Sequence, residues 1–513
     1  MAVMLRSAGL WLGLVLLLSS HGAIAERSED LCGKNFVFAF PPNLHPSSNE
    51  FQVVLTSCSS ASRTTVNIST PSHDIQYFST QFISNSESLT VTLPGEIADE
   101  REVFFIHGTV LISSDHDITV VAVSGQKRTM ASFPIIPTTS LGQEYVVITY
   151  VNEVESTGLP AEFAISSLSE NTHVTIQLSN DALPSNDWSV QYSADEQVEL
   201  DLFSYDSVLF RSAEGLTGTQ IRSDKPISVV AGSACIFVPN DLLACDHIVE
   251  HIPPVNRWGS RYIVPPFMGR QSGYVYRVVA ARDETRITYQ DKESRTIVID
   301  KGEFIERNIE EDYTSLVTAD KPILVAQFAK GNFTDGIGDP AMLIVTPIEQ
   351  YVSQVAFSTF NVSAHDIENE YLTVITLCDH LDNLRLNGMS LEVSDGSMMR
   401  VDVLTDYCVL RRPLWTKGYH KITSVSLATK FTAFQYGFGI RIAYAHPVAF
   451  GLKKITCKGY DKRGGEKEQN ANHKIQRSPC LPVLIMPLCT HTMAEYPPYP
   501  GTSQLPWITQ MTS

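Results

Sequence analysis

Short apolar runs recur along the whole chain, each bordered by Asn, Asp, Gly or Ser. Runs such as "VTIQL", "QVELDL" and "SVLF" alternate or cluster Val, Ile, Leu and Phe, as β-strands do. No long stretch keeps the apolar period of an α-helix. The hydrophobic pattern therefore predicts an all-β fold.

Three markers return in the same order four times along the chain. The clearest is "SSDHDITVVAVSG", echoed by "RSDKPISVVAGS", "TADKPILVAQFAKG" and, more faintly, "SLATKFTAFQYGFG". Another opens each unit as "CGKNFVFAF", "LGQEYVVITY", "WGSRYIVPPF" or "YVSQVAFSTF". Asp115, Asp224 and Asp320 mark the first three units and lie roughly 100 residues apart, a spacing that indicates internal repeats.

The second repeat holds about eight candidate strands in about 100 residues, which is the density of a β-sandwich. A β-propeller-like array is the alternative, because it also has evenly spaced strands and turns. A repeat of about 100 residues exceeds the ordinary propeller blade of roughly 40–50 residues. We therefore predict four tandem β-sandwich-like repeats, at residues 26–136, 137–253, 254–346 and 347–457.

The two ends of the chain differ from the repeats. Residues 1–25 carry Arg6, the apolar run "LWLGLVLLL" and then "AIA", which predicts a signal peptide cleaved between Ala25 and Glu26. Residues 458–513 are polar and then proline-rich, so we expect a disordered tail. No later segment has the apolar length of a transmembrane helix, and we expect a secreted, extracellular protein.

Secretion would place the nine cysteines in an oxidising compartment, where disulfides are the default. Cys235 and Cys245 are close enough in sequence to staple one loop, although spacing alone does not fix connectivity. Further candidate pairs are Cys32 with Cys58 and Cys378 with Cys408. Cys457, Cys480 and Cys489 remain, so at least one thiol is unpaired or joins a partner chain.

Glycosylation sequons and the net charge indicate which classes of binding partner the protein can have. Three sequons, at Asn67 ("NIS"), Asn332 ("NFT") and Asn361 ("NVS"), predict a glycoprotein. The net charge of −18 argues against nucleic acid and anionic membranes, because both reward a basic surface.

One segment, "ACDHIVEHIPP", resembles an enzyme site. His247, Glu250 and His251 form H-x-x-E-H, in which two histidines one helical turn apart can hold Zn²⁺ and the glutamate can act on bound water. The stretch "NDLLACDHIVEHI" could form a helix capped by Asn240 before the two prolines. A zinc-dependent hydrolase is therefore one alternative.

The repeats argue against that alternative. Aligned on the connector prolines, the box corresponds to "MASFP" in the first connector and "PAMLI" in the third, which carry no metal ligand. We interpret the box as a connector in which His247 bonds a neighbouring backbone group and Glu250 pairs with Arg257 or Arg261.

Other candidate chemistry is weaker. The loop "GNFTDGIGDP" places Asp335 and Asp339 among glycines, but it lacks the ligand ladder of an EF-hand, so we expect a glycosylated surface turn. No G-x-S-x-G elbow, P-loop or G-x-G-x-x-G fingerprint occurs. We expect no catalytic residue, metal or cofactor, and no enzyme.

The segments "SDKPISVVAGSAC", "CDHIVEHIPPVNRWGSRYIVPPF" and "TSLGQEYVVITY" together resemble the amino-terminal domain of the IgGFc-binding protein family, over about residues 32–457. The resemblance implies a domain of secreted, mucus-associated glycoproteins that bind the Fc part of immunoglobulin G. Nine cysteines are too few for the von Willebrand factor type D modules of the large members, which implies a stand-alone version or a fragment.

We therefore expect a secreted, non-catalytic glycoprotein that binds another extracellular glycoprotein, a glycan or a mucus component, in adhesion or innate defence. Besides the zinc hydrolase, a structural component of extracellular matrix or mucus remains an alternative.

Overall fold

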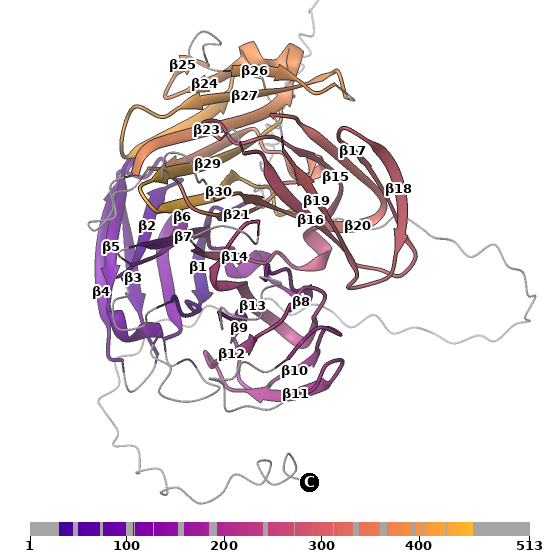
Figure 1. The fold of residues 1–513 in the computed structure, drawn as a ribbon. Helices are drawn as coiled ribbons and strands as arrows, with labels where there is room; N and C mark the ends of the chain where they lie inside the picture. The colour runs from indigo at the N-terminus through magenta and orange to yellow at the C-terminus, as the bar shows by residue number, and fades with distance from the viewer. Residues whose placement is uncertain are drawn as a thin grey trace, which may run out of the picture. The chain divides into compact units, whose positions relative to one another are not determined.

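A computed structural model of the chain describes residues 30–44, 50–71, 75–98, 106, 108–126, 128–151, 159–183, 192–239, 245–270, 272–310, 312–331, 338–359, 367–391, 397–402, 404–426 and 428–454. In these residues the chain forms antiparallel strands and a few short 3₁₀ helices (Figure 1), which confirms the all-β prediction. None of the described helices is long and apolar enough to cross a membrane. The expected signal peptide and tail, Asn332, Asn361, Asp335 and the last three cysteines lie outside the described residues.

The first sheet has seven strands organised around one long strand. The strand order is β4-β3-β6-β2-β5, and β1 and β7 also pair with β6. The first half of β6 pairs with β1 and β3, and its second half pairs with β2 and β7, so one strand belongs to two faces. The bounds are β1 Gly33–Phe38, β2 Glu50–Ser57, β3 Arg63–Ser69, β4 Phe78–Ser84, β5 Ser88–Leu93, β6 Val110–Gln126 and β7 Thr129–Pro134.

The second and third sheets have the same plan. Their orders are β11-β10-β13-β9-β12, with β8 and β14 on β13, and β18-β17-β20-β16-β19, with β15 and β21 on β20. The second sheet comprises β8 Gly142–Val146, β9 Ala161–Ser167, β10 Thr172–Gln177, β11 Gln197–Leu202, β12 Ser207–Ser212, β13 Gln220–Ile236 and β14 Asp246–His251. The third comprises β15 Gly259–Val264, β16 Tyr274–Ala280, β17 Thr285–Gln290, β18 Ser294–Ile299, β19 Phe304–Ile309, β20 Ser315–Ala329 and β21 Ala341–Ile344.

The remaining strands form two sheets, ordered β22-β28-β24-β25 and β26-β27-β23-β29-β30. Here β28 and β29 take the places of the two halves of a long strand, since β28 pairs with β22 and β24 while β29 pairs with β23 and β30. The pairing in this region therefore resembles that of the first three sheets, with two separate strands in place of one long strand. The bounds are β22 Gln354–Ser358, β23 Ile367–Leu377, β24 Leu384–Leu386, β25 Met389–Ser390, β26 Ser397–Arg400, β27 Tyr407–Pro413, β28 Tyr419–Ser424, β29 Phe431–Gly439 and β30 Ile442–Ala449.

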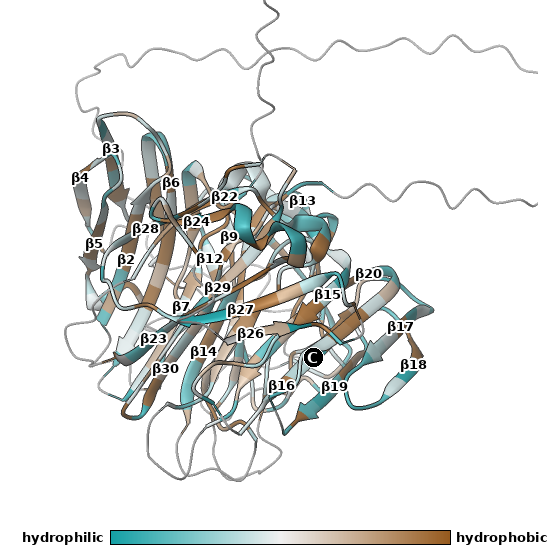
Figure 2. Cartoon of the chain, turned by 90° about the horizontal axis from the view of Figure 1, so that it is seen from above, coloured by the Kyte–Doolittle hydropathy of each residue, from teal (hydrophilic) through white to brown (hydrophobic). Residues whose placement is uncertain are grey.

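Apolar side chains of the strands are buried in several clusters. One cluster is formed by residues of the first sheet and includes Phe36, Phe38, Phe40 and Phe51, each at most 1 % exposed. Apolar and polar residues interleave along the strands (Figure 2), as expected where one side of a strand faces a core. Disulfides join Cys32 to Cys58, Cys235 to Cys245 and Cys378 to Cys408, the same three pairs named from the sequence.

Each connector proline packs on the glycine that opens the preceding sheet. Pro137, Pro254 and Pro347 precede the 3₁₀ helices Thr138–Ser140, Val255–Arg257 and Ile348–Gln350. A Cβ atom added to Gly33, Gly142 or Gly259 would lie 2.4, 2.5 or 2.4 Å from the Cβ of these prolines, in that order. Only glycine therefore fits at the start of these three sheets.

The two ends of the described chain meet. Asp30 forms an antiparallel bridge with Gly451, two residues after the end of β30. The buried side-chain amide of Gln350 then binds both backbone groups of Lys453, donating to its carbonyl at 2.8 Å and accepting from its N–H at 3.0 Å. Arg257 also donates to the carbonyl of Leu452. A glutamine side chain thus acts as a strand partner for the last described segment.

The close approach at Gly259 gives the first prediction. In Gly259→Ala the methyl group would overlap the Pro347 ring, and we expect the free energy of unfolding to fall by about 1–3 kcal/mol in urea titrations. Gly215→Ala is the matched control, because its nearest atom would be 3.7 Å away, and its change should stay within about 0.5 kcal/mol. Equal stability of the two variants would contradict the packing described.

Candidate functional site

The H-x-x-E-H box lies on a strand and not on a helix. His247, Glu250 and His251 belong to β14, which pairs antiparallel with β13. On a strand the two histidines are about 13 Å apart, four rises of ~3.3 Å, and cannot share one zinc ion with bonds of about 2 Å. Within the part of the chain that the structure describes, no cluster of three His, Cys, Asp or Glu could hold a metal. The helical alternative is therefore wrong for Asp246–His251.

The box lies where four strands meet, which we call the hub. Strands β7, β14, β21 and β30, the last strand of each unit, contact one another in cyclic order, β7 to β14, β14 to β21, β21 to β30 and β30 to β7. The space between them is lined by residues 130–132, 247–249, 341–342 and 443–445 and has no room for a water molecule. The hub therefore offers no substrate access.

One carboxylate joins three strands of the hub. Asp246 accepts the backbone N–H of Met130 at 2.6 Å and that of His247 at 2.8 Å on Oδ1, and that of Ala443 at 2.9 Å on Oδ2. Burial raises the pKa of Asp246 well above its usual range, and the nearby charge of Asp339 adds to this. Asp246 thus connects β14 with β7 and β30.

Glu250 makes the connection to the remaining strand. Its Oε1 accepts the backbone N–H of Ile344 in β21 at 3.2 Å, and burial raises the pKa of this carboxyl well above its usual range. We expected Arg257 or Arg261 to pair with Glu250. Arg257 donates to the carbonyl of Leu452, and Arg261 lies 3.3 Å from the carboxylate of Glu349. The glutamate is placed to serve a backbone group and not a catalytic water.

The histidines of the hub are neutral and bound to protein groups. His247 Nδ1 lies 3.0 Å from the carbonyl of Ser233, a backbone partner as expected. His251 Nδ1 accepts the N–H of Ile136 at 3.1 Å, which leaves the proton on Nε2, 3.2 Å from Ser228 Oγ. Burial lowers the pKa of His247 to about 4 and that of His251 to about 3. Both nitrogens of His251 are therefore engaged.

The loop "GNFTDGIGDP", for which we expected a glycosylated surface turn, is only partly described. Asp339 is buried, and burial raises its pKa to about 6, so it does not lie on a surface turn as expected. Its backbone carbonyl accepts a hydrogen bond from Arg270 at 2.8 Å.

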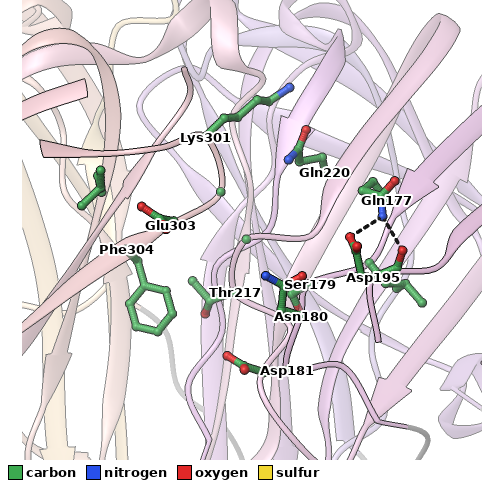
Figure 3. A pocket seen from close by; sticks show the side chains of 14 residues that line it. Gln177, Ser179, Asn180, Asp181, Asp195, Thr217, Gln220, Lys301, Glu303 and Phe304 are labelled. Carbon is green, nitrogen blue, oxygen red and sulfur yellow. Dashed lines mark hydrogen bonds between the residues drawn. The ribbon is translucent and has the colours of Figure 1, made fainter. Parts of the chain in front are cut away.

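An open cleft lies instead between the second and third sheets (Figure 3). Two of its lining residues, Gly218 and Gly302, touch each other, since a Cβ on Gly218 would lie 2.3 Å from the Gly302 carbonyl oxygen. Both glycines have positive φ, 98° and 84°. The cleft has a volume of ≈ 550 Å³ and is lined by residues 177–181, 195, 217, 218 and 220 from the second sheet and 299 and 301–304 from the third.

The cleft lining is polar, with one aromatic side chain. Figure 3 shows Asn180 and Asp181 on one wall and Glu303 and Phe304 on the other. The Phe304 ring is half-buried, and its centroid lies 4.8 Å from the Arg277 guanidinium. Asp181 is exposed. Such a lining can offer hydrogen bonds and one apolar face to a ligand.

A second hollow of ≈ 490 Å³ adjoins the cleft at Lys301 and contains an ion cluster. Both carboxylate oxygens of Glu144 lie 2.9 Å from Arg282, and Oε1 lies 2.9 Å from Lys301 Nζ. Burial alone would raise the pKa of Glu144, but the hydrogen bonds from these two cations outweigh it and lower the pKa. The cluster links the second sheet to the third beside the cleft.

Sequence reasoning missed the cleft. The turns "LTGTQ" and "DKGEF" signal glycine at positive φ, but nothing in the sequence shows that Gly218 and Gly302 touch. Only the packing of two sheets brings Asp181 and Glu303 to one cleft.

Comparison with known proteins gives two matches. A family model described as "IgGFc binding protein" matches residues 130–437, more than half of the chain, including the box and both walls of the cleft. The human IgGFc-binding protein is 25 % identical over 475 residues, which cover 90 % of this chain and 8 % of the human protein. The chain therefore spans less than a tenth of the length of this curated relative.

The buried histidine gives a pH-dependence that can be tested with His251→Gln. The unfolded state takes up a proton on histidine near pH 6.5, whereas the folded His251 does so only near pH 3. Stability from this group is therefore lost as the pH falls, and wild type should lose about 2 kcal/mol relative to His251→Gln between pH 7 and pH 5. Urea unfolding of both proteins at several pH values measures this difference.

The exposed His173 is the control with the opposite sign. The hydrogen bond that His173 Nδ1 donates to the Asp201 carboxylate raises the pKa of His173, so its contribution is present at low pH and is lost as the pH rises. Wild type should gain slightly over His173→Gln as the pH falls. A pH-independent offset for His251→Gln would contradict the buried neutral state.

Proposed function

Because the chain belongs to the IgGFc-binding protein family, we propose that it is a secreted, non-catalytic glycoprotein that binds another extracellular glycoprotein or glycan. The name of the human relative states that it binds the Fc part of immunoglobulin G. Fc is therefore the first ligand to test, followed by mucus glycoproteins and free glycans.

The cleft between the second and third sheets is the observation that supports a binding role. Its volume of ≈ 550 Å³ falls within the range of about 300–1,000 Å³ that ligand sites occupy. It is open and polar, and the contact of its lining residues Gly218 and Gly302 joins its two walls. Walls held together in this way reduce the ordering cost of binding. We propose that a loop or a short glycan of the partner enters this cleft.

The zinc-hydrolase alternative finds no support. The box is a buried strand, and both ring nitrogens of His251 are bonded to protein groups. A structural role in matrix or mucus remains the competing proposal; it predicts self-association and no saturable ligand.

Charge reversal in the cleft tests the binding role. Asp181→Lys changes an exposed residue of the cleft wall, so folding should be retained while affinity for the partner falls about tenfold or more. An array of Fc, secreted glycoproteins and glycans identifies the partner, and surface plasmon resonance then measures the affinity of both proteins.

Asp406→Lys is the matched control, because it makes the same charge change at an exposed residue beside β27. Its affinity should equal that of wild type. Saturable binding that Asp181→Lys leaves unchanged would remove the cleft from the proposal, and no saturable binder on the array would favour the structural role.

A further inference from the structure

The outer face of the first sheet carries two exposed aromatic rings. Phe78 and Phe82 lie on the edge strand β4 and are 71 % and 51 % exposed. Two large apolar side chains on an open strand edge invite pairing with another chain, unless something covers them.

A glycosylation sequon lies between these rings. In the register of β3 with β4, Asn67 is opposite Thr80, Thr65 is opposite Phe82, and Ser69 is opposite Phe78. Side chains at diagonal cross-strand positions are about 7–8 Å apart and within reach of aromatic rings. Asn67, of the sequon "NIS", therefore has a phenylalanine on each diagonal.

The side-chain amide of Asn67 is hydrogen-bonded through its oxygen, and glycosylation takes place at its nitrogen. Thr80 Oγ1 donates to Asn67 Oδ1 at 2.9 Å, so this bond uses the oxygen and not the nitrogen that a glycan would join. Arg63 already lies against Phe82, with its guanidinium carbon 3.6 Å from the ring centroid. Arg63 and Asn67 are on opposite sides of Thr65 along β3, which leaves the Asn67 side of Phe82 to another group.

The sister sheets provide an internal comparison. Thr175 and Thr288 occupy the position of Asn67, opposite Glu199 and Thr296. Neither forms a sequon, and the diagonal residues are Asp201 and Gln197 in one sheet and Val298 and Ser294 in the other. Among these three described sheets, the aromatic pair and the sequon occur together in the first.

We propose that Asn67 carries an N-linked glycan whose inner sugars lie across Phe78 and Phe82 and cover the edge of β4. In the transfer, Asn67 Nδ2 loses one proton and bonds to the anomeric carbon of the sugar. The bond from that carbon to the polyprenyl diphosphate carrier breaks, and the diphosphate leaves. The apolar faces of the sugar rings then rest on the π-faces of the two phenylalanines. The inference rests on the proposed secretion, because the sugar donor belongs to the secretory pathway.

Secretion from animal cells through a heterologous leader tests the inference independently of the native leader. Wild type, Ser69→Ala and Ser84→Ala are compared by mass spectrometry of the Asn67 peptide before and after enzymatic deglycosylation. We expect a glycan in wild type and in Ser84→Ala, whose sequon is intact, and none in Ser69→Ala. An unmodified Asn67 in secreted wild type would overturn the proposal.

Hydroxyl-radical footprinting then tests whether the glycan covers Phe78 and Phe82, by measuring how fast their rings are oxidised. Oxidation of Phe78 and Phe82 should rise several-fold in Ser69→Ala, while Phe203, which is 67 % exposed and directly follows β11, should not change. Equal oxidation with and without the glycan, or protection that disappears on dilution, would overturn the proposal, the latter in favour of a second copy of the chain. Ser69→Ala should bind the partner as wild type does, so failure here is distinct from failure of the proposed function.

Discussion

The buried carboxylate of Asp246 is the interaction on which the arrangement of the hub depends. It accepts backbone N–H groups from β7, β14 and β30, strands that belong to different sheets and have no ladder between them. Buried N–H groups need acceptors, and each one left without a partner costs about 1–3 kcal/mol. Glu250 and His251 supply acceptors to Ile344 and Ile136 in the same way. Polar side chains thus join sheets whose backbones do not pair.

This arrangement explains why a metal-site motif can occur without metal chemistry. Histidine and glutamate can serve either as buried hydrogen-bond acceptors or as zinc ligands. The spacing H-x-x-E-H is the same in a zinc site and in this hub. Whether the two histidines can share a metal depends on whether the segment is a helix or a strand. Pairing with β13 places Asp246–His251 in a strand and overrides whatever helix propensity the segment has. The binding that we propose lies instead at the surface cleft between the second and third sheets.

Much of the fold could be predicted from the sequence, because the order of apolar and polar residues within each short segment indicates a β-strand. The markers around Asp115, Asp224 and Asp320 fall on the long strands β6, β13 and β20, and the faint fourth marker falls where β28 and β29 are separate strands. "MASFP" and "PAMLI", aligned with the box by connector prolines, lie on β7 and on and beside β21, strands that contact β14. The cyclic contact of the last strands was not predictable, because an open array of repeats would have the same spacing. The cleft depends on Gly218 and Gly302, which are distant in sequence.

The meeting of Asp30 with Gly451 has a mechanical consequence. The bridge is antiparallel, so tension applied before Asp30 and after Gly451 would open the contact one bond at a time instead of shearing a whole strand. On the C-terminal side the load would meet the Gln350 amide before it reached the bridge, because Gln350 binds Lys453 through both of its polar atoms. Under force the molecule would therefore yield first at this seam, while the sheets, whose strands are joined by ladders of several hydrogen bonds, stay folded.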